Sequence, residues 1–332
     1  MAVVFMEGFD HLSEAQLVAQ KGWVMVSNSS ASVAGRYGGM AARVGNALKT
    51  HALPAAYTTL YVGCAINSGT TASDDTVCLM ALGAQAVRVQ IYNNGSYQAL
   101  RFVNAAGTQL AIGTTQILPG VWYHYAIKAV ASTTVGTVEL RLNGSPTAEM
   151  AATGVNTGAN GFDAIRWQSW NSQQVSLDDL YALDTSGPAP TNDWIGDCRI
   201  ETIRPTGDGT NTAWANGYVN VADSASNDGD GTFISSSTPG AKETYGLTDL
   251  SITAGTVFAV QTNLVARKAD AGAKTIAPVI RIGVTDYDGT TTGPLADTYV
   301  DYRQLYDRVD PSGADWTIAT VNAMEAGVKE VA

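Results

Sequence analysis

The sequence is poor in charged side chains and lacks the long apolar runs of membrane proteins. Charged residues make up 15% of its 332 residues, well below the roughly 25% usual for soluble proteins. The net charge of −11 argues against a nucleic-acid-binding protein, because phosphate contacts need clustered Lys and Arg. No apolar run reaches the length of about 18 residues that a membrane span needs. Uncharged polar and small apolar side chains must therefore cover much of the surface.

Cysteine is also scarce. The chain has only Cys64, Cys78 and Cys198, with no Cys-x-x-Cys pair, which predicts thiols rather than a disulfide framework. Cys64 and Cys78 facing each other across a hairpin remains an open alternative. The first residues lack a basic start, and their apolar run ends at Glu7, so we expect no secretory signal and synthesis in a cytoplasm.

The residue patterns of common catalytic sites are missing as well. The three histidines, His11, His51 and His124, lie far apart, and no GxSxG, HExxH or Walker motif occurs. We interpret His124 as a strand residue with satisfied ring nitrogens. Asp178 and Asp179 are adjacent, so on a regular strand they point to opposite faces and suit a structural hydrogen bond at a strand edge. The sequence predicts no catalytic residue and no enzyme.

The sequence has many segments in which apolar and polar residues alternate with a period of two, and glycine-rich turns separate these segments. Apolar and polar residues alternate over 87–92 and 137–142, and Asn-Gly pairs follow both segments. We expect further strands over 97–103, 257–266 and 276–284. Short amphipathic strands with tight turns predict an all-β protein of two antiparallel β-sandwich domains with few short helices.

Two short helices and one domain boundary are predicted. The helices span 13–21, capped by Ser13 and ended by Gly22, and 320–329. Prolines and a glycine in 186–191 (SGPAPT) predict an extended connector. We therefore expect a first domain over 1–187, a linker over 188–196 and a second β-rich domain over 197–332. The first 190 residues carry a net charge of −2 and the remainder −9.

Two groups of residues are candidates for ligand binding. Trp167 and Trp170 lie three apart, so on a strand they face opposite sides, and an exposed indole suits a glycan or a protein partner. The alternative is one core tryptophan with the other under a loop. In the acidic loop 223–232, Asn227, Asp228 and Asp230 are candidate calcium ligands; a solvated turn is the alternative. The loop 286–289 (DYDG) is a weaker calcium candidate of the same kind.

Three segments of the first half resemble the concanavalin A-like, or laminin-G-like, jelly roll. They are 120–126 (GVWYHYA), 136–144 (GTVELRLNG) and 177–184 (LDDLYALD), and the opening 7–10 (EGFD) also suits this group. The resemblance implies a jelly-roll first domain. Some relatives bind calcium or carbohydrate through loop residues, but those ligands do not map onto this chain, and the carboxylate motif of the glucanase branch is absent.

The whole chain looks similar to structural proteins of tailed bacteriophages, in which this jelly roll is joined to a second β-domain. The matching segments are 196–209 (GDCRIETIRPTGDG), 265–272 (VARKADAG), 310–311 (DP), 315–317 (DWT), 321–323 (VNA) and 325–328 (EAGV).

The resemblance implies a non-enzymatic virion protein, tail-associated as a fibre, spike or collar component, that reaches the virion after synthesis in the host cytoplasm. Its partners would be other phage structural proteins and further copies of itself, with no nucleic acid and no membrane. No cofactor is implied, apart from the calcium ion considered above. A head decoration protein is one alternative; a carbohydrate-binding module that contacts host surface glycans is another.

Overall fold

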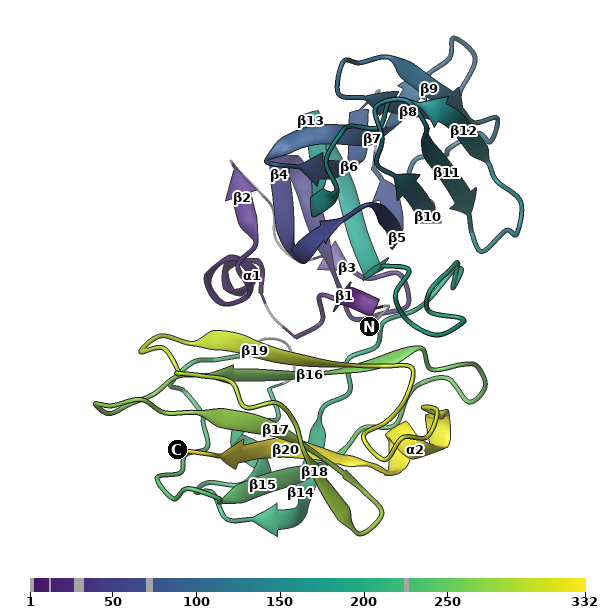
Figure 1. Cartoon of the computed structure of the whole chain (residues 1–332). Helices are drawn as coiled ribbons and strands as arrows, with labels where there is room; N and C mark the ends of the chain where they lie inside the picture. The colour runs from purple at the N-terminus through teal and green to yellow at the C-terminus, as the bar shows by residue number, and fades with distance from the viewer. Residues whose placement is uncertain (1–2, 12, 27–32, 70–73, 224–226) are drawn as a thin grey trace. The chain divides into compact units, whose positions relative to one another are not determined.

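The computed structural model describes residues 3–11, 13–26, 33–69, 74–223 and 227–332 (Figure 1). The chain forms two compact units. The first comprises Met1–Asp10 and Gly22–Ile200, and the second comprises His11–Lys21 and Glu201–Ala332. A short N-terminal segment therefore belongs to the same unit as the C-terminal part of the chain. Within the described residues, no helix is long and apolar enough to cross a membrane.

The first unit is an antiparallel β-sandwich, and its strands are paired in the order β12-β11-β10-β5-β13-β6-β7-β8-β9. Strands β1 and β4 also pair with β13, and β2 and β3 pair with β4. The strands are β1 (Val3–Glu7), β2 (Val24–Val26), β3 (Val33–Ala34), β4 (Met40–Tyr57), β5 (Thr59–Ser68), β6 (Asp74–Ala81), β7 (Ala84–Asn93), β8 (Gln98–Asn104), β9 (Gln109–Ile112), β10 (Trp122–Val130), β11 (Gly136–Leu142), β12 (Met150–Val155) and β13 (Phe162–Leu183).

Strand β13 is long enough to serve both layers of the sandwich. Its first half pairs with β6 from Ala164 to Trp167, and its second half pairs with β5 from Val175 to Leu183. Strand β4 runs beside both halves. The large buried side chains of the unit, such as Phe102 and Tyr125, have almost no exposed surface. Alternation of buried and half-buried residues along β11 follows the pattern that its sequence predicts.

The predicted turns of the first unit are confirmed, whereas the suggested pairing of two cysteines is wrong. Asn143 and Gly144 both have positive φ, and the N–H of Ser145 donates to Leu142 at 2.9 Å, so a tight turn follows β11 at the predicted residues. Cys64 lies on β5 and Cys78 on β6, and β13 separates these strands. The two cysteines therefore do not face each other across a hairpin, and the cysteines of the chain carry thiols.

The second unit is also built from antiparallel sheets. Five strands pair in the order β14-β15-β20-β17-β18, and β16 pairs with β19 (Figure 1). Half-buried Val260 of β16 and Tyr306 of β19 pack on a core that contains Ile280 and Trp316. The strands are β14 (Pro205–Thr212), β15 (Lys242–Leu247), β16 (Ala259–Ala266), β17 (Ile276–Ile282), β18 (Thr285–Asp288), β19 (Val300–Asp307) and β20 (Glu325–Glu330), with a 3-10 turn η1 (Tyr218–Asn220).

Helix α1 (Glu14–Lys21) confirms the first helix prediction and packs on β19. The backbone N–H and the hydroxyl of Ser13 both donate to the Gln16 side chain, at 2.8 and 2.9 Å, in a capping box. The second prediction is half wrong. Helix α2 (Ile318–Ala323) ends after six residues, and the rest of the predicted helix is strand β20. Gly327 there lies against the backbone of Glu243, which leaves no room for a side chain.

Candidate functional site

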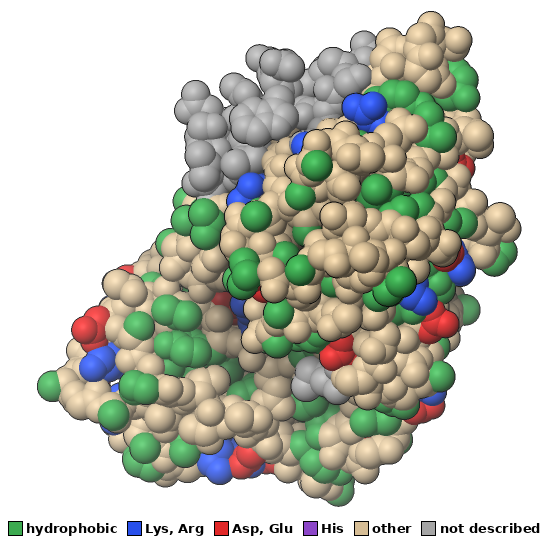
Figure 2. Space-filling view, turned by 45° about the horizontal axis from the view of Figure 1, so that its top comes forward, with side chains coloured by type: hydrophobic (Ala, Val, Ile, Leu, Met, Phe, Trp, Pro, Cys, Tyr) green, Lys and Arg blue, Asp and Glu red, His purple; other side chains and the backbone are tan. Residues whose placement is uncertain are grey.

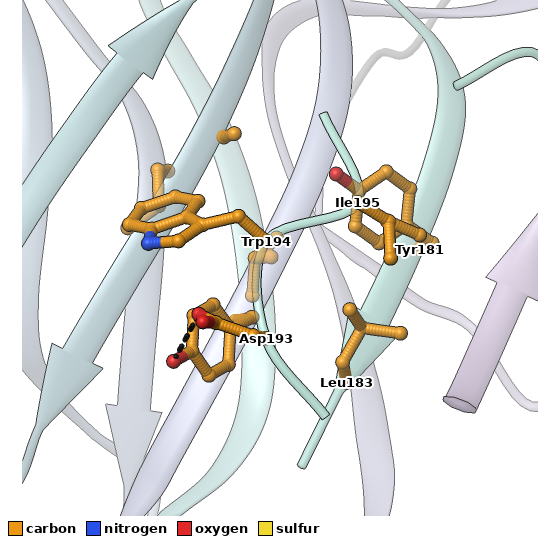
Figure 3. Close-up of a pocket in the computed structure, with 9 residues that line it drawn as sticks. Tyr181, Leu183, Asp193, Trp194 and Ile195 are labelled. Atoms are coloured by element: carbon orange, nitrogen blue, oxygen red, sulfur yellow. Dashed lines mark hydrogen bonds between the residues drawn. The ribbon is translucent and has the colours of Figure 1, made fainter. Parts of the chain in front are cut away.

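The segment 188–200, here called the connector, packs on the first unit instead of extending freely. The indole of Trp194 meets Tyr61 of β5 edge to face, with ring centroids 5.3 Å apart. The guanidinium of Arg141 on β11 lies 4.2 Å above the indole. The hydroxyl of Tyr61 donates a hydrogen bond of 2.9 Å to Asp193 (Figure 3). The predicted linker over 188–196 is therefore not free of the sheet, because aromatic and polar contacts fix this segment on it.

A second tyrosine fixes the next turn of the connector. The hydroxyl of Tyr181 on β13 donates to the carbonyl of Gly196 at 2.7 Å. Its ring lies so close to Gly63 of β5 that a side chain at that position would collide with it. Tyr181, Leu183, Trp194 and Ile195 line a shallow depression of about 150 Å³, counted together with the solvent to which it opens (Figure 3). The connector thus fills most of the space above this part of the sheet.

Asp178 and Asp179 hold the end of the connector and a loop of the first unit. The pairing of β13 with β5 shifts register between Asp178 and Tyr181, and Asp179 has a φ of 51°. This irregularity breaks the alternation expected of adjacent strand residues, and both side chains are buried. Asp178 accepts a hydrogen bond of 2.8 Å from the N–H of Arg36, and Asp179 accepts one of 2.8 Å from the N–H of Ile200.

Arg36 joins this carboxylate pair to the connector. Its guanidinium forms a two-pronged ion pair with Asp197, with distances of 2.5 and 2.6 Å. The same group lies 3.9 Å from Asp179. Such forked contacts are among the stronger charge-assisted hydrogen bonds in proteins. The loop before β4 and the connector are therefore tied to the same pair of residues on β13.

Burial sets the protonation behaviour of these groups. It raises the pKa of Asp178 to about 7, with the neighbouring Asp179 charge as the next cause. It also raises the pKa of Asp179 to about 6, against the opposing hydrogen bond from Ile200. His124 is fully buried, stacks on Tyr181 and has its pKa lowered by burial to about 4. Burial likewise raises the pKa of Cys198 to about 12, so its thiol stays protonated.

His124 lies on a strand, as predicted, but its ring is not satisfied. Both ring nitrogens lack a hydrogen-bond partner among the described residues. A fully buried neutral imidazole that packs on an aromatic ring is out of contact with molecules in solution. The arrangement suits packing rather than proton transfer.

The predicted tryptophan pair does not form an exposed platform. Trp167 has no exposed surface and packs against Trp23, with ring centroids 5.6 Å apart. It is a core residue, so its predicted role in ligand stacking is corrected. The side chain of Trp170 lies outside the described residues.

The two predicted calcium loops use their oxygens within the protein. Asp230 accepts hydrogen bonds of 2.8 Å from both Arg267 and Tyr299, and Asp228 accepts two from Thr232. Asn227 accepts one from Gly229. Hydrogen bonds of this kind fit the turn that the sequence left as the alternative, and calcium binding stays a prediction.

The second loop is strand β18. Asp286 there pairs with Arg281 at 2.5 Å, and Asp288 pairs with Lys242 and Lys329, both at 2.6 Å. Across the part of the chain that the structure describes, no three His, Cys, Asp or Glu side chains are grouped to hold a metal ion.

Sequence reasoning missed the residues that anchor the connector. Trp194 and Asp197 lie in the predicted linker and the junction that follows it, and Arg36 stands alone in a glycine-rich stretch. The only local signal was a tryptophan flanked by acidic and apolar residues directly after a proline-rich stretch. A tryptophan is rarely left in solvent, which argues against a free linker.

No protein-family model matches the chain, and no curated protein matches its sequence. Solved structures similar to it include domain 4 of AbnA, a GH43 extracellular arabinanase from Geobacillus stearothermophilus, at 13% identity and a TM-score of 0.37, covering 54% of this chain and 93% of that one. The carbohydrate-binding module CBM66 from Bacillus subtilis is 13% identical, with a TM-score of 0.33, over 50% of this chain and 97% of its own.

The lectin UEA-II in complex with galactose is 9% identical, with a TM-score of 0.35, over 54% of this chain and 97% of its own. By their names, the three are a domain of an arabinanase, a carbohydrate-binding module and a lectin. The all-β architecture of this chain rests on its own strands and their antiparallel pairing.

Proposed function

We propose that this chain is a non-enzymatic structural component of a tailed-phage virion, tail-associated as a fibre, spike or collar protein, that assembles through surfaces of its β-sandwiches. One observation carries the proposal: apolar side chains are exposed at the tips of hairpins. Leu82 between β6 and β7 is 74% exposed, Val135 between β10 and β11 is 71% exposed, and Val284 between β17 and β18 is 88% exposed. Exposed apolar side chains that gather into one patch are typical of sites where proteins interact.

Leu82 and Val135 belong to the same end of the first unit. The loop 156–161 links their hairpins, because the N–H of Thr157 donates to Ser132 at 2.9 Å and Gly158 lies beside Ala86. The four loops 82–84, 105–108, 131–135 and 156–161 contain no charged residue. Burying such loops against another protein requires little desolvation of ions, with Asp163, which accepts from the N–H of Leu82, as the charged group beside them. We call these four loops the uncharged rim.

The wider surface supports the same reading. The face drawn in Figure 2 carries scattered hydrophobic side chains among uncharged polar ones, with charged groups sparse and of both signs. The resemblance of 196–209 and of the C-terminal segments to structural proteins of tailed phages is the ground on which we propose a virion.

The proposal is tested first by assembly. We expect the full chain to form oligomers in light scattering after size-exclusion chromatography, and Leu82→Ser with Val135→Ser to shift it toward monomer. The matched control is Thr133→Ser with Thr108→Ser on the same rim, which leaves the apolar side chains in place. A chain that is monomeric at all concentrations and with isolated virion proteins would contradict assembly.

The position of the chain on the virion is tested with purified phage particles. Gold-labelled antibodies against the chain should mark the tail of intact virions. Labelling of heads instead would favour the head-decoration alternative, and the absence of the chain from purified particles would remove the virion proposal.

A second candidate function is carbohydrate binding by the first unit, and the surroundings of Trp194 favour it. The half-buried indole lies beside the depression, Arg141 stacks on it, and Glu139 pairs with Arg141 at 2.7 Å. An aromatic ring flanked by charged hydrogen-bonding groups is a common composition of sugar sites.

A glycan array and quenching of tryptophan fluorescence by host polysaccharide test this function. Trp194→Phe should weaken the signal, and Trp214→Phe in the second unit is the control. Failure of the assembled particle to bind any glycan would exclude it.

A further inference from the structure

Asp178 and Asp179 form an unusual pair of neighbouring buried carboxyl groups. They are 5% and 2% exposed, and each holds a different segment of the chain through a backbone N–H. Asp178 also accepts a hydrogen bond of 2.9 Å from the N–H of Asp179. Two like charges this close in a low-dielectric site strongly disfavour double ionisation.

The cations around the pair, Arg36 and Arg199, offset only part of the effect of burial on Asp179. Arg36 is already engaged with Asp197 by both prongs of its guanidinium, and it lies 3.9 Å from Asp179. The Oδ2 atom of Asp179 has no hydrogen-bond partner among the described residues. The titratable groups that face the pair or its partners are Asp10 after β1, Arg36 and Tyr37 before β4, His124 on β10, and Asp197, Cys198 and Arg199 in the connector.

We propose that the Asp178–Asp179 pair keeps a proton on the acid side of neutral pH and that loss of this proton loosens the end of the connector from the first unit. The device is a latch: one carboxyl group holds the loop before β4 and the other holds Ile200. With both groups ionised, repulsion acts on residues whose positions fix these two segments. The inference concerns regulation of the fold and does not rest on the proposed function.

The direction of the pH effect follows from the shifts. The pKa values of Asp178 and Asp179 are raised to about 7 and about 6. The folded state therefore binds these protons more tightly than the unfolded state, so their stabilising contribution is complete below about pH 4 and is lost as pH rises to about 7. His124 works in the opposite direction, because its pKa is lowered to about 4 and its charging destabilises the fold in acid.

Asp179→Asn separates the two effects. The amide oxygen can still accept from Ile200, and the amide nitrogen takes the place of Oδ2, to which no described group donates. Asp184→Asn, at the half-exposed residue after β13, is the matched control. We expect the melting temperature of the wild-type chain to fall between pH 5.5 and pH 8. In Asp179→Asn this fall should be reduced by about half, since one of the two coupled carboxyl groups no longer ionises, while the control behaves like the wild type.

Hydrogen exchange of the two backbone amides that the carboxyl groups hold measures the opening of the latch directly. After correction for the intrinsic pH effect, the Arg36 and Ile200 amides of the wild-type chain should exchange faster at pH 8 than at pH 6, and those of Asp179→Asn should change less. Equal pH dependence in the wild type and Asp179→Asn would overturn the proposal. Should the variant not fold, carbon NMR of the wild-type carboxyl groups decides: at least one titration above pH 5 in this pair supports the latch, and none above pH 5 refutes it.

Discussion

Lys21 and Asp301 form an ion pair of 3.2 Å in which both side chains are completely buried. Lys21 is the last residue of helix α1, and Asp301 lies near the start of β19. A segment close to the N-terminus is thus fastened to the C-terminal half of the chain inside the second unit. The nearest further cation is Arg303, at 3.9 Å from Asp301.

Removal of this lysine should strongly destabilise the second unit. In Lys21→Met, Asp301 stays buried without its main partner, and we expect a loss of about 3–5 kcal/mol in the free energy of unfolding. Replacing both residues, as in Lys21→Met with Asp301→Leu, should recover most of it. Denaturant titration measures both. The control Lys268→Met breaks an exposed pair with Asp297 and should cost less than about 1 kcal/mol.

The second unit should also depend on the rest of helix α1. Leu17 of this helix is 3% exposed and belongs to the second unit. A fragment of residues 201–332 should therefore be digested by chymotrypsin much faster than the same unit in the full chain. Adding a peptide of residues 11–21 should slow the digestion. Equal protease resistance of the bare fragment would show that the helix is dispensable.

Trp194 should control how firmly the connector is held. In Trp194→Ala the contacts with Tyr61 and Arg141 are lost, and we expect a loss of about 1–3 kcal/mol with faster cleavage within 188–200 by limited proteolysis. Trp194→Phe should keep most of the resistance, because an aromatic ring remains over Tyr61. Cleavage rates that do not change in Trp194→Ala would refute a docked connector.

Protonation of His124 should limit the stability of the first unit at low pH. Its pKa is lowered from 6.5 to about 4, so its contribution is present at neutral pH and is lost as pH falls through this range. That shift corresponds to about 3 kcal/mol. His124→Phe keeps a ring against Tyr181 and cannot be protonated, so its melting temperature should fall less than that of the wild type between pH 6.5 and pH 4. If the melting temperature of His124→Phe falls as much as that of the wild type, groups other than His124 limit the stability of the first unit in acid.

Local patterns were enough to predict most elements of this fold. The alternation over 87–92 and the Asn143-Gly144 turn each depend on side chains within a few residues, and both occur as expected. The cap of helix α1 by Ser13 is equally local. The prediction was wrong where pairing with neighbouring strands determines the secondary structure. The segment 320–329 has helical spacing, but its second half is taken into the sheet between β15 and β17, where Gly327 fits.

The candidate site was predicted less well, since it depends on contacts between distant segments. A proline-rich stretch predicts an extended backbone. The contacts that the connector makes with Tyr61 and Tyr181 join residues far apart in the sequence, so no local pattern predicts them. A register shift places Asp178 and Asp179 in one buried cluster, although strict alternation separates them. Trp167 was judged by its spacing from Trp170, whereas the core formed with Trp23 decides its position.

The connector follows β13 after only four residues, 184–187, and this short link has a mechanical consequence. A pull on the connector away from the first unit acts along a strand that is hydrogen-bonded to β5 on one side and to β1 and β4 on the other. Such a load shears many hydrogen bonds together instead of opening them one after another. We therefore expect the first unit to withstand high tensile force when stretched through this end.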